Sequence, residues 1–180
     1  MNFEIRTAVE SDFEAIEILI AASIRKLGAS DYSAEQIEAA LKTAFGLDRQ
    51  LVADRTYFIV ETDQKAVACG GWSYRQTLFG NDLEQDRDAT RIDPQSGAAK
   101  IRAFFVDAEF ARMGIGSMIL EKCEEEALKA GFTKFELMST LPGLKLYDKH
   151  GFVAGTALQY PLGESLSIEF VPMLKQISKN

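Results

Sequence analysis

A glycine-containing segment in the second half of the chain has the residues of an anion-binding turn. It places Gly114-Ile115-Gly116 between residues 101–106, which are rich in β-formers, and a stretch whose apolar residues recur with helical spacing. The first N–H groups of a helix have no partner inside the helix and lie at the positive end of its dipole, and glycines let a diphosphate approach the backbone. Arg112 adds a positive charge beside them. The segment is a candidate diphosphate site, although both glycines could equally serve only to pack a strand against a helix.

The residues present argue against several other kinds of catalytic, nucleotide-binding and metal site. His150 is the only histidine, so a serine or cysteine relay would depend on this one residue, and it is predicted to be a surface residue beside a helix-ending glycine. No G-x-x-x-x-G-K-[ST] segment occurs, and no G-x-G-x-x-G segment follows a predicted strand. Cys69 and Cys123 have the spacing of neither a disulfide framework nor a zinc site, and we predict buried thiols. No metal site is expected.

Composition is that of a soluble globular domain. The 180 residues are 47% hydrophobic and carry a formal net charge of −7, which is enough apolar material for one packed core. No apolar run reaches the roughly 18 residues of a membrane helix, and no secretory signal is visible, so we expect a cytoplasmic protein without membrane partners. The acidic balance argues against nonspecific nucleic-acid binding. It is compatible with a cationic acceptor, but plain solubility explains it as well.

The elements that must position the glycine turn are predicted from periodicity and capping signals. Ser11 with Glu14 and Ser33 with Gln36 have the spacing of capping boxes, and the two helices that they begin are expected to end at glycines 28 and 46. The other predicted elements are strands at 3–7, 57–61, 66–74, 101–106, 134–139, 152–158 and 166–174, and helices at 114–131 and 141–150.

Residues 75–99 differ from the rest. They are acidic, contain several turn formers and show little apolar periodicity, so we predict a mobile loop, with a short helix at 82–88 as an alternative. The predicted order is βααβββαβαββ, without repeats or linkers. This indicates a mixed α/β (α+β) fold in a single domain over residues 1–180, with a mixed central sheet of about seven strands flanked by about four helices.

The region around the glycine turn resembles a known family. A strand, Arg112-x-Gly114-x-Gly116, an amphipathic helix, another strand and Leu146-Tyr147-x-x-x-Gly151-Phe152 are similar to the acetyl-CoA core of the GNAT superfamily of acetyltransferases. The similarity spans about residues 100–153, and the remaining elements agree in order. The resemblance implies the GNAT fold and an N-acetyltransferase that takes acetyl-CoA as cosubstrate and an amine as acceptor.

The resemblance also implies a set of cofactor contacts. Backbone groups of Phe104, Phe105 and Val106 would pair with the pantetheine arm and polarise the thioester carbonyl. The family often has Gln or Arg where this chain has Ala111, and many members have Asn where it has Thr140, whose hydroxyl could replace that contact. The diphosphate would be held by Arg112, Met113, Gly114, Ile115, Gly116 and Ser117.

Two catalytic residues follow from the same resemblance. Tyr147 would be the general acid that protonates the leaving thiolate, since a phenol with a pKa of about 10 is a suitable donor; a core aromatic is the alternative. Some members carry a glutamate base where this chain has Lys100, so Glu136 on the next strand is the remaining candidate base. Proton loss to water, with Glu136 as an outward-facing charge, is an equally compatible account.

The acceptor site is predicted from the alternation of side chains along the strand that precedes the glycine turn. Lys100, Arg102 and Phe104 would share the face that, by resemblance, looks toward the acceptor, with Tyr32 and Gln36 on the opposite wall. A guanidinium suits a carboxylate, so we expect a small-molecule amine with an acidic group rather than a polyamine. In the alternative, Arg102 pairs internally with a carboxylate of residues 82–93.

Three broader questions stay open on sequence alone. A non-catalytic acyl-CoA-binding or regulatory module and a protein N-acetyltransferase are the rival functions. The acceptor itself is not identified, because fold-level analogy does not read it. The oligomeric state is open too, with a homodimer as one option.

Overall fold

The computed structural model describes residues 1–78 and 88–178. Its strands form one sheet in the order β1-β2-β3-β4-β5-β8-β6, with β7 also paired to β8. Among the described residues β4 and β5 are parallel, and the other strand pairs are antiparallel. The strands are β1 (Glu4–Thr7), β2 (Tyr57–Thr62), β3 (Lys65–Ser73), β4 (Ala99–Val106), β5 (Lys134–Thr140), β6 (Val153–Ala154), β7 (Leu158–Pro161) and β8 (Ser167–Gln176).

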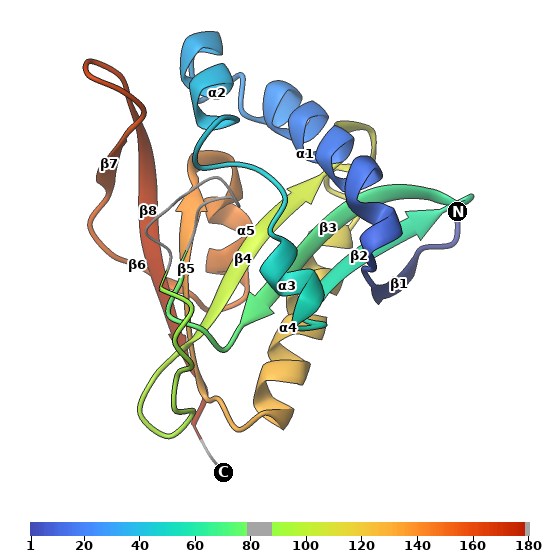
Figure 1. Ribbon diagram of the computed structural model, residues 1–180, viewed down its shortest axis with the longest axis vertical. Coiled ribbons are helices and arrows are strands. Elements are labelled where there is room, and N and C mark those ends of the chain that lie inside the picture. The colour runs from blue at the N-terminus through green and yellow to red at the C-terminus, as the bar shows by residue number, and fades with distance from the viewer. Residues whose placement is uncertain (79–87, 179–180) are drawn as a thin grey trace.

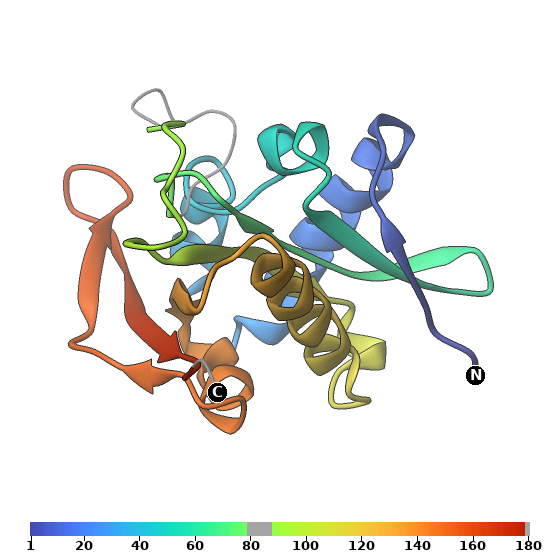
Figure 2. The ribbon, with the colours of Figure 1, turned by 90° about the horizontal axis from the view of Figure 1, so that it is seen from below.

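Helices cover both faces of this sheet. They are α1 (Phe13–Leu27), α2 (Ala34–Ala40), α3 (Arg49–Ala53), α4 (Ile115–Lys129) and α5 (Leu144–Lys149). Helices α1 to α3 lie on one face and α4 and α5 on the other (Figures 1 and 2). Each face has its own hydrophobic core, one built around Ile119 and Phe135 and the other around Ile16 and Tyr57. The predicted mixed α/β fold is confirmed, and no helix of the described residues is long and apolar enough to span a membrane.

The N-terminal helices differ in detail from the prediction. The Ser33–Gln36 capping box is confirmed, with Ser33 Oγ accepting from Gln36 N at 3.1 Å and Gln36 Oε1 accepting from Ser33 N at 2.8 Å. The box at Ser11 is wrong, because Asp12 instead accepts from Val9 N at 2.8 Å and a 3-10 turn precedes α1. The second helix ends at Ala40, before the predicted glycine.

The observed order is βαααβββαβαβββ, so one helix and one strand are added to the prediction. The added helix, α3, has five residues, too few for a periodic apolar face to be recognised. The added strand arises because the predicted strand at 152–158 is divided into β6 and the start of β7, which pair with different parts of β8.

Only the two ends of the acidic segment at 75–99 belong to the described residues. The predicted mobile loop, and the helix predicted at 82–88 as its alternative, fall largely on residues 79–87, which lie outside the described residues. Both described ends are packed on the protein. Arg75 donates to Asp54 at 2.6 and 2.7 Å, and Ile92 N donates to Tyr74 O at 2.8 Å. These contacts attach the segment to α3 and to the end of β3.

Strands β4 and β5 meet only at their beginnings. Their register joins Ala99 to Phe135 and Lys100 to Glu136, while the rest of β5 pairs with β8 on its other side. Figure 1 shows the two strands diverging beyond this point, with α5 behind the gap. From Ile101 onward, β4 therefore presents an edge without a strand partner from β5.

Candidate active site

A pocket opens where β4 and β5 part. It contains about 620 Å³ of atom-free space, part of it open to solvent. Its walls include Phe104 and Tyr147, which pack with the α4 core, and Phe105 and Phe170, which pack with the α1–α3 core. Because these cores lie on opposite faces, the pocket lies within the sheet layer and is lined from both faces. Its lining residues are Ala44, Phe45, Gly46, Leu78, Ile101, Arg102, Ala103, Phe104, Phe105, Met138, Thr140, Tyr147 and Phe170.

A bulge in β4 shapes this opening. Arg102 lies opposite Gly71 and Phe105 opposite Cys69, so β4 has one residue too many between them, and Ala103 takes φ +54°. The extra residue reverses the alternation of side chains. Phe104 therefore joins the α4 core while Ala103 and Phe105 join the other. The predicted shared face of Lys100, Arg102 and Phe104 is wrong for Phe104.

Gly70 makes the bulge possible. A Cβ at this position would lie 2.7 Å from the Phe104 ring, so only glycine leaves room for it. A glycine inside a strand often marks a bulge or a close approach, and this was the signal in the sequence that could have located it.

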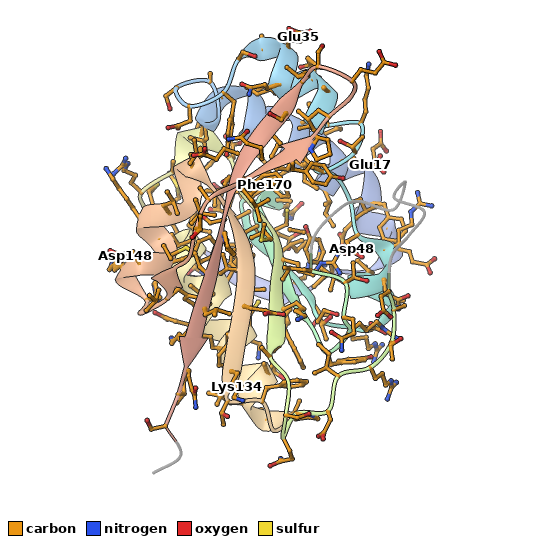
Figure 3. The ribbon with its side chains drawn as sticks, turned by 90° about the vertical axis from the view of Figure 1, so that its left-hand side faces the viewer. Glu17, Glu35, Asp48, Lys134, Asp148 and Phe170 are labelled. Carbon is orange, nitrogen blue, oxygen red and sulfur yellow. The ribbon has the colours of Figure 1, made fainter. Side chains whose placement is uncertain are left out.

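Arg102 lines the pocket, but its charge is already paired. Its side chain is 2% exposed and forms an ion pair with Asp48, which is fully buried. The guanidinium also donates from Nη1 to Thr77 O at 3.1 Å. Arg102 thus pairs internally, as the alternative prediction had it, and the partner that the described residues supply is Asp48, just before α3. Of the predicted partner segment at 82–93, residues 82–87 lie outside the described residues. In Figure 3 Asp48 lies between β4 and α3.

Lys100 and Glu136 form an ion pair at the last rung that joins β4 and β5. Burial lowers the pKa of Lys100. Neither residue is among those that line the pocket. The predicted base is therefore engaged with a cation at the closed end of the gap, and the structure brings neither Glu136 nor Lys100 to the pocket wall.

Tyr32 and Gln36 are also absent from the pocket lining. The Tyr32 hydroxyl donates to Glu169 O at 2.9 Å and accepts from Leu141 N at 2.8 Å, and Gln36 Nε2 donates to Ser167 O at 2.7 Å. Burial raises the pKa of Tyr32 to about 12. Both side chains attach the start of α2 to β8, so their polar groups are used within the protein and do not form the expected acceptor wall.

Tyr147 lies in the pocket wall on the α4 side. Its ring meets Phe104 and Phe152 edge-on, with centroids 6.1 and 5.8 Å apart. Burial raises its pKa, so the phenol is neutral at physiological pH. None of the described residues hydrogen-bonds its hydroxyl. A Cβ on Gly143 would lie 3.2 Å from the ring, so glycine at this position leaves room for the ring.

The glycine turn has the backbone of an anion site. Arg112 and Gly114 take φ +63° and +85°, and α4 begins directly after them. The N–H groups of Ile115, Gly116 and Ser117 have no acceptor within the helix. A Cβ on Gly114 would meet nothing within 4 Å, so the space beside the turn is open to a ligand. These groups fit a diphosphate.

Two contacts near this turn differ from the expected ones. His150 is half-buried rather than free on the surface, because its Nε2 lies 2.8 Å from Ser117 Oγ. Val106 N donates to Ser23 Oγ at 3.2 Å. The N–H of Val106 is therefore bonded to α1. Of the three residues predicted to contact the pantetheine arm of acetyl-CoA, Phe104 and Phe105 remain as candidates. Thr140 lies in the pocket wall, as expected of a ligand contact.

Several pocket residues were missed by sequence analysis. Phe45 falls at the end of the second predicted helix and Phe170 within the predicted strand at 166–174, and nothing in either pattern indicates a pocket. Asp48 could have been found as a helix cap, since its carboxylate accepts from Leu51 N at 3.4 Å. Among the described residues, no group of His, Cys, Asp and Glu side chains could hold a metal ion.

Comparison with known proteins supports the fold. The sequence model of the acetyltransferase (GNAT) family matches residues 18–152. Similar folds include PaiA N-acetyltransferase from Thermoplasma acidophilum in complex with coenzyme A, with a TM-score of 0.67 and 17% identity over 98% of this chain and 100% of that one. A GCN5-related N-acetyltransferase from Rhodopseudomonas palustris has a TM-score of 0.71 and 18% identity over 98% and 97% of the two chains.

A third similar structure is the ribosomal-protein-S18-alanine N-acetyltransferase from Escherichia coli, with a TM-score of 0.62 and 16% identity over 99% of this chain and 96% of that one. At these identities the likeness shows the fold alone. No curated protein sequence matches the chain.

Proposed function

The chain belongs to the GNAT family of acetyltransferases, and we propose that it transfers the acetyl group of acetyl-CoA to the amine of a small molecule by direct attack. The observation that carries this proposal is the pocket in the gap of the sheet, lined by Tyr147 from one face and by Phe45, Phe105 and Phe170 from the other. A donor and an acceptor can enter it from opposite faces and meet between β4 and β5.

The α4 side of the pocket suits the donor. The N–H groups at the start of α4 and the charge of Arg112 would bind the diphosphate of acetyl-CoA. The thioester would then lie in the gap beside the unpartnered edge of β4. Backbone N–H groups on such an edge are fixed before the reaction, so they can stabilise the oxyanion that forms on the thioester carbonyl.

The reaction needs one acid and no covalent intermediate between the enzyme and the acetyl group. The amine nitrogen attacks the carbonyl carbon, the C–N bond forms, and the C–S bond breaks. The Tyr147 hydroxyl gives its proton to the departing thiolate and recovers one from water. Because Glu136 is paired with Lys100, the proton of the attacking nitrogen passes to water in this proposal.

Release of free thiol from acetyl-CoA tests the proposal. The purified chain is incubated with acetyl-CoA and a library of small amines, and product mass is checked for one added acetyl group. Amine-dependent thiol release supports the proposal. Binding of acetyl-CoA without release in the presence of any amine indicates a non-catalytic acyl-CoA-binding module, and faster release with peptide N-termini than with small amines indicates a protein N-acetyltransferase.

A further inference from the structure

The acceptor side of the pocket is aromatic. Phe45 packs edge-on against Phe105 and Phe170, with centroid separations of 6.1 and 5.8 Å. Ala44, Leu78 and Met138 complete this part of the wall. A surface of ring edges and methyl groups binds a ligand by removing its apolar area from water.

Charge on this wall is balanced within the protein. Arg102 is the only charged residue among the described lining residues, and its two terminal nitrogens are held by Asp48 and by Thr77 O. A carboxylate on the acceptor would find this guanidinium engaged. A second ammonium would find that the nearby carboxylate, Asp48, is fully buried and paired. Among the described lining residues, neither charge would find an available partner of opposite sign. Burying an unpaired charge is costly.

We infer that the acceptor carries its amine on an uncharged aromatic or aliphatic body, with neither a carboxylate nor a second ammonium group. This inference rests on the proposed acetyl transfer and replaces the acidic acceptor expected from the sequence. That expectation assumed an available guanidinium, and the buried pair with Asp48 removes the assumption.

Two matched pairs of amines test the inference. Phenylalanine differs from phenethylamine by a carboxylate, and hexamethylenediamine differs from hexylamine by a second ammonium. Thiol release gives kcat/KM for each. We expect phenethylamine to exceed phenylalanine, and hexylamine to exceed the diamine, each by about tenfold or more, because the charged member leaves an unpaired group in the pocket.

Substitutions locate the effect in the pocket. Asp48→Asn keeps the size of the side chain and removes its charge, so Arg102 becomes available to a carboxylate. The ratio of kcat/KM for phenylalanine to that for phenethylamine should rise about tenfold. Phe45→Leu should raise the KM for phenethylamine several-fold through lost contact area. Phe3→Leu is the matched control, because Phe3 packs edge-on against Phe110, away from the pocket, and should leave that KM unchanged.

The possible results separate the inference from the proposed function. If phenylalanine or the diamine is the better member of its pair, or if Phe45→Leu leaves the KM unchanged, the inference is wrong while the proposed acetyl transfer stands. If no amine or peptide stimulates thiol release although acetyl-CoA binds, the proposed function fails, and the inference fails with it. Should Asp48→Asn not fold, the two amine pairs and Phe45→Leu still decide whether the inference is correct.

Discussion

Tyr147 combines the features expected of a proton donor, since it lies in the pocket wall, its pKa is raised by burial, and no described residue holds its hydroxyl. Replacing it with phenylalanine removes the proton and keeps the ring contacts with Phe104 and Phe152. We expect Tyr147→Phe to lower kcat by about 10²-fold or more with unchanged acetyl-CoA affinity. Steady-state kinetics and calorimetry measure both. An unchanged kcat would make Tyr147 a packing residue.

The buried Arg102–Asp48 ion pair is expected to affect the stability of the protein. Removing one member of a buried pair leaves the other charge unpaired in an apolar site, at a cost of about 3–5 kcal/mol. We therefore expect Arg102→Ala to lower the free energy of unfolding by about this amount in urea denaturation. Arg25→Ala is the matched control, because the Arg25–Glu38 pair is exposed, and it should have little effect. Equal losses in the two variants would contradict the assignment.

Individual residues were predictable to different degrees. Tyr147 and the glycine turn could be located because each lies in a short motif whose spacing reflects local chain geometry. The position of Phe104 could not be obtained from alternation, because one extra residue at Ala103 reverses the pattern. The partner of Arg102 was equally inaccessible, since Asp48 is distant in sequence and is brought near by α3.

The start of α4 is the element on which the proposed cofactor site depends. Gly114 takes φ +85°, which favours glycine, and opens the turn to a ligand. Gly114→Asp would add modest strain of about 1 kcal/mol and a carboxylate that repels the diphosphate. We expect acetyl-CoA affinity, measured by calorimetry, to fall about tenfold or more, because the carboxylate repels the diphosphate and offsets the positive end of the helix dipole.

A second glycine on the same helix supplies the control. Gly131 follows the other end of α4 and takes φ +95°, so Gly131→Asp introduces the same charge and similar strain far from the turn. It should lower the thermal midpoint without weakening acetyl-CoA binding. If both variants bound acetyl-CoA equally well, the start of α4 would not be the diphosphate site.

The elements themselves were mostly predictable, and their mutual arrangement was not. The Ser33 capping box and the apolar face of α4 are local signals that survive in the structure. The divergence of β4 from β5 depends on the bulge in β4 and on β8, which pairs with the far side of β5. Gly70 is a local signal of the bulge, but the pairing of β5 with β8 has none, so the gap that forms the pocket appears only once the sheet is assembled.

For the whole molecule, the two helical layers divide the proposed chemistry. The layer of α4 and α5 supplies the glycine turn and Tyr147, and the layer of α1 to α3 supplies Phe45 and Asp48 (Figure 2). The sequence motifs belong to the first layer, which explains why the resemblance predicts a donor site and not the acceptor. Acceptor specificity in this architecture can change in the second layer without disturbing the first.

The buried phenols and thiols predict how stability of the whole molecule depends on pH. Burial raises the pKa of Cys69 to about 12 and raises those of Tyr57, Cys123 and Tyr147. The unfolded chain loses these protons from about pH 8.5 for thiols and about pH 10 for phenols, while the native protein retains them. The unfolded state then binds fewer protons, so the free energy of unfolding must fall as pH rises through this range.

Urea denaturation at about pH 8 and at about pH 10.5 measures the effect, with each fully linked group contributing up to about 1.4 kcal/mol per pH unit. High salt separates this linkage from general repulsion on an acidic protein, because screening weakens repulsion between exposed charges and leaves buried groups almost unaffected. Tyr147→Phe removes one linked phenol, so its stability should decline less steeply above about pH 10 than that of the unaltered protein. A free energy of unfolding that stays constant between the two pH values in high salt would show that these groups ionise as readily in the native state as in the unfolded one, contrary to their burial.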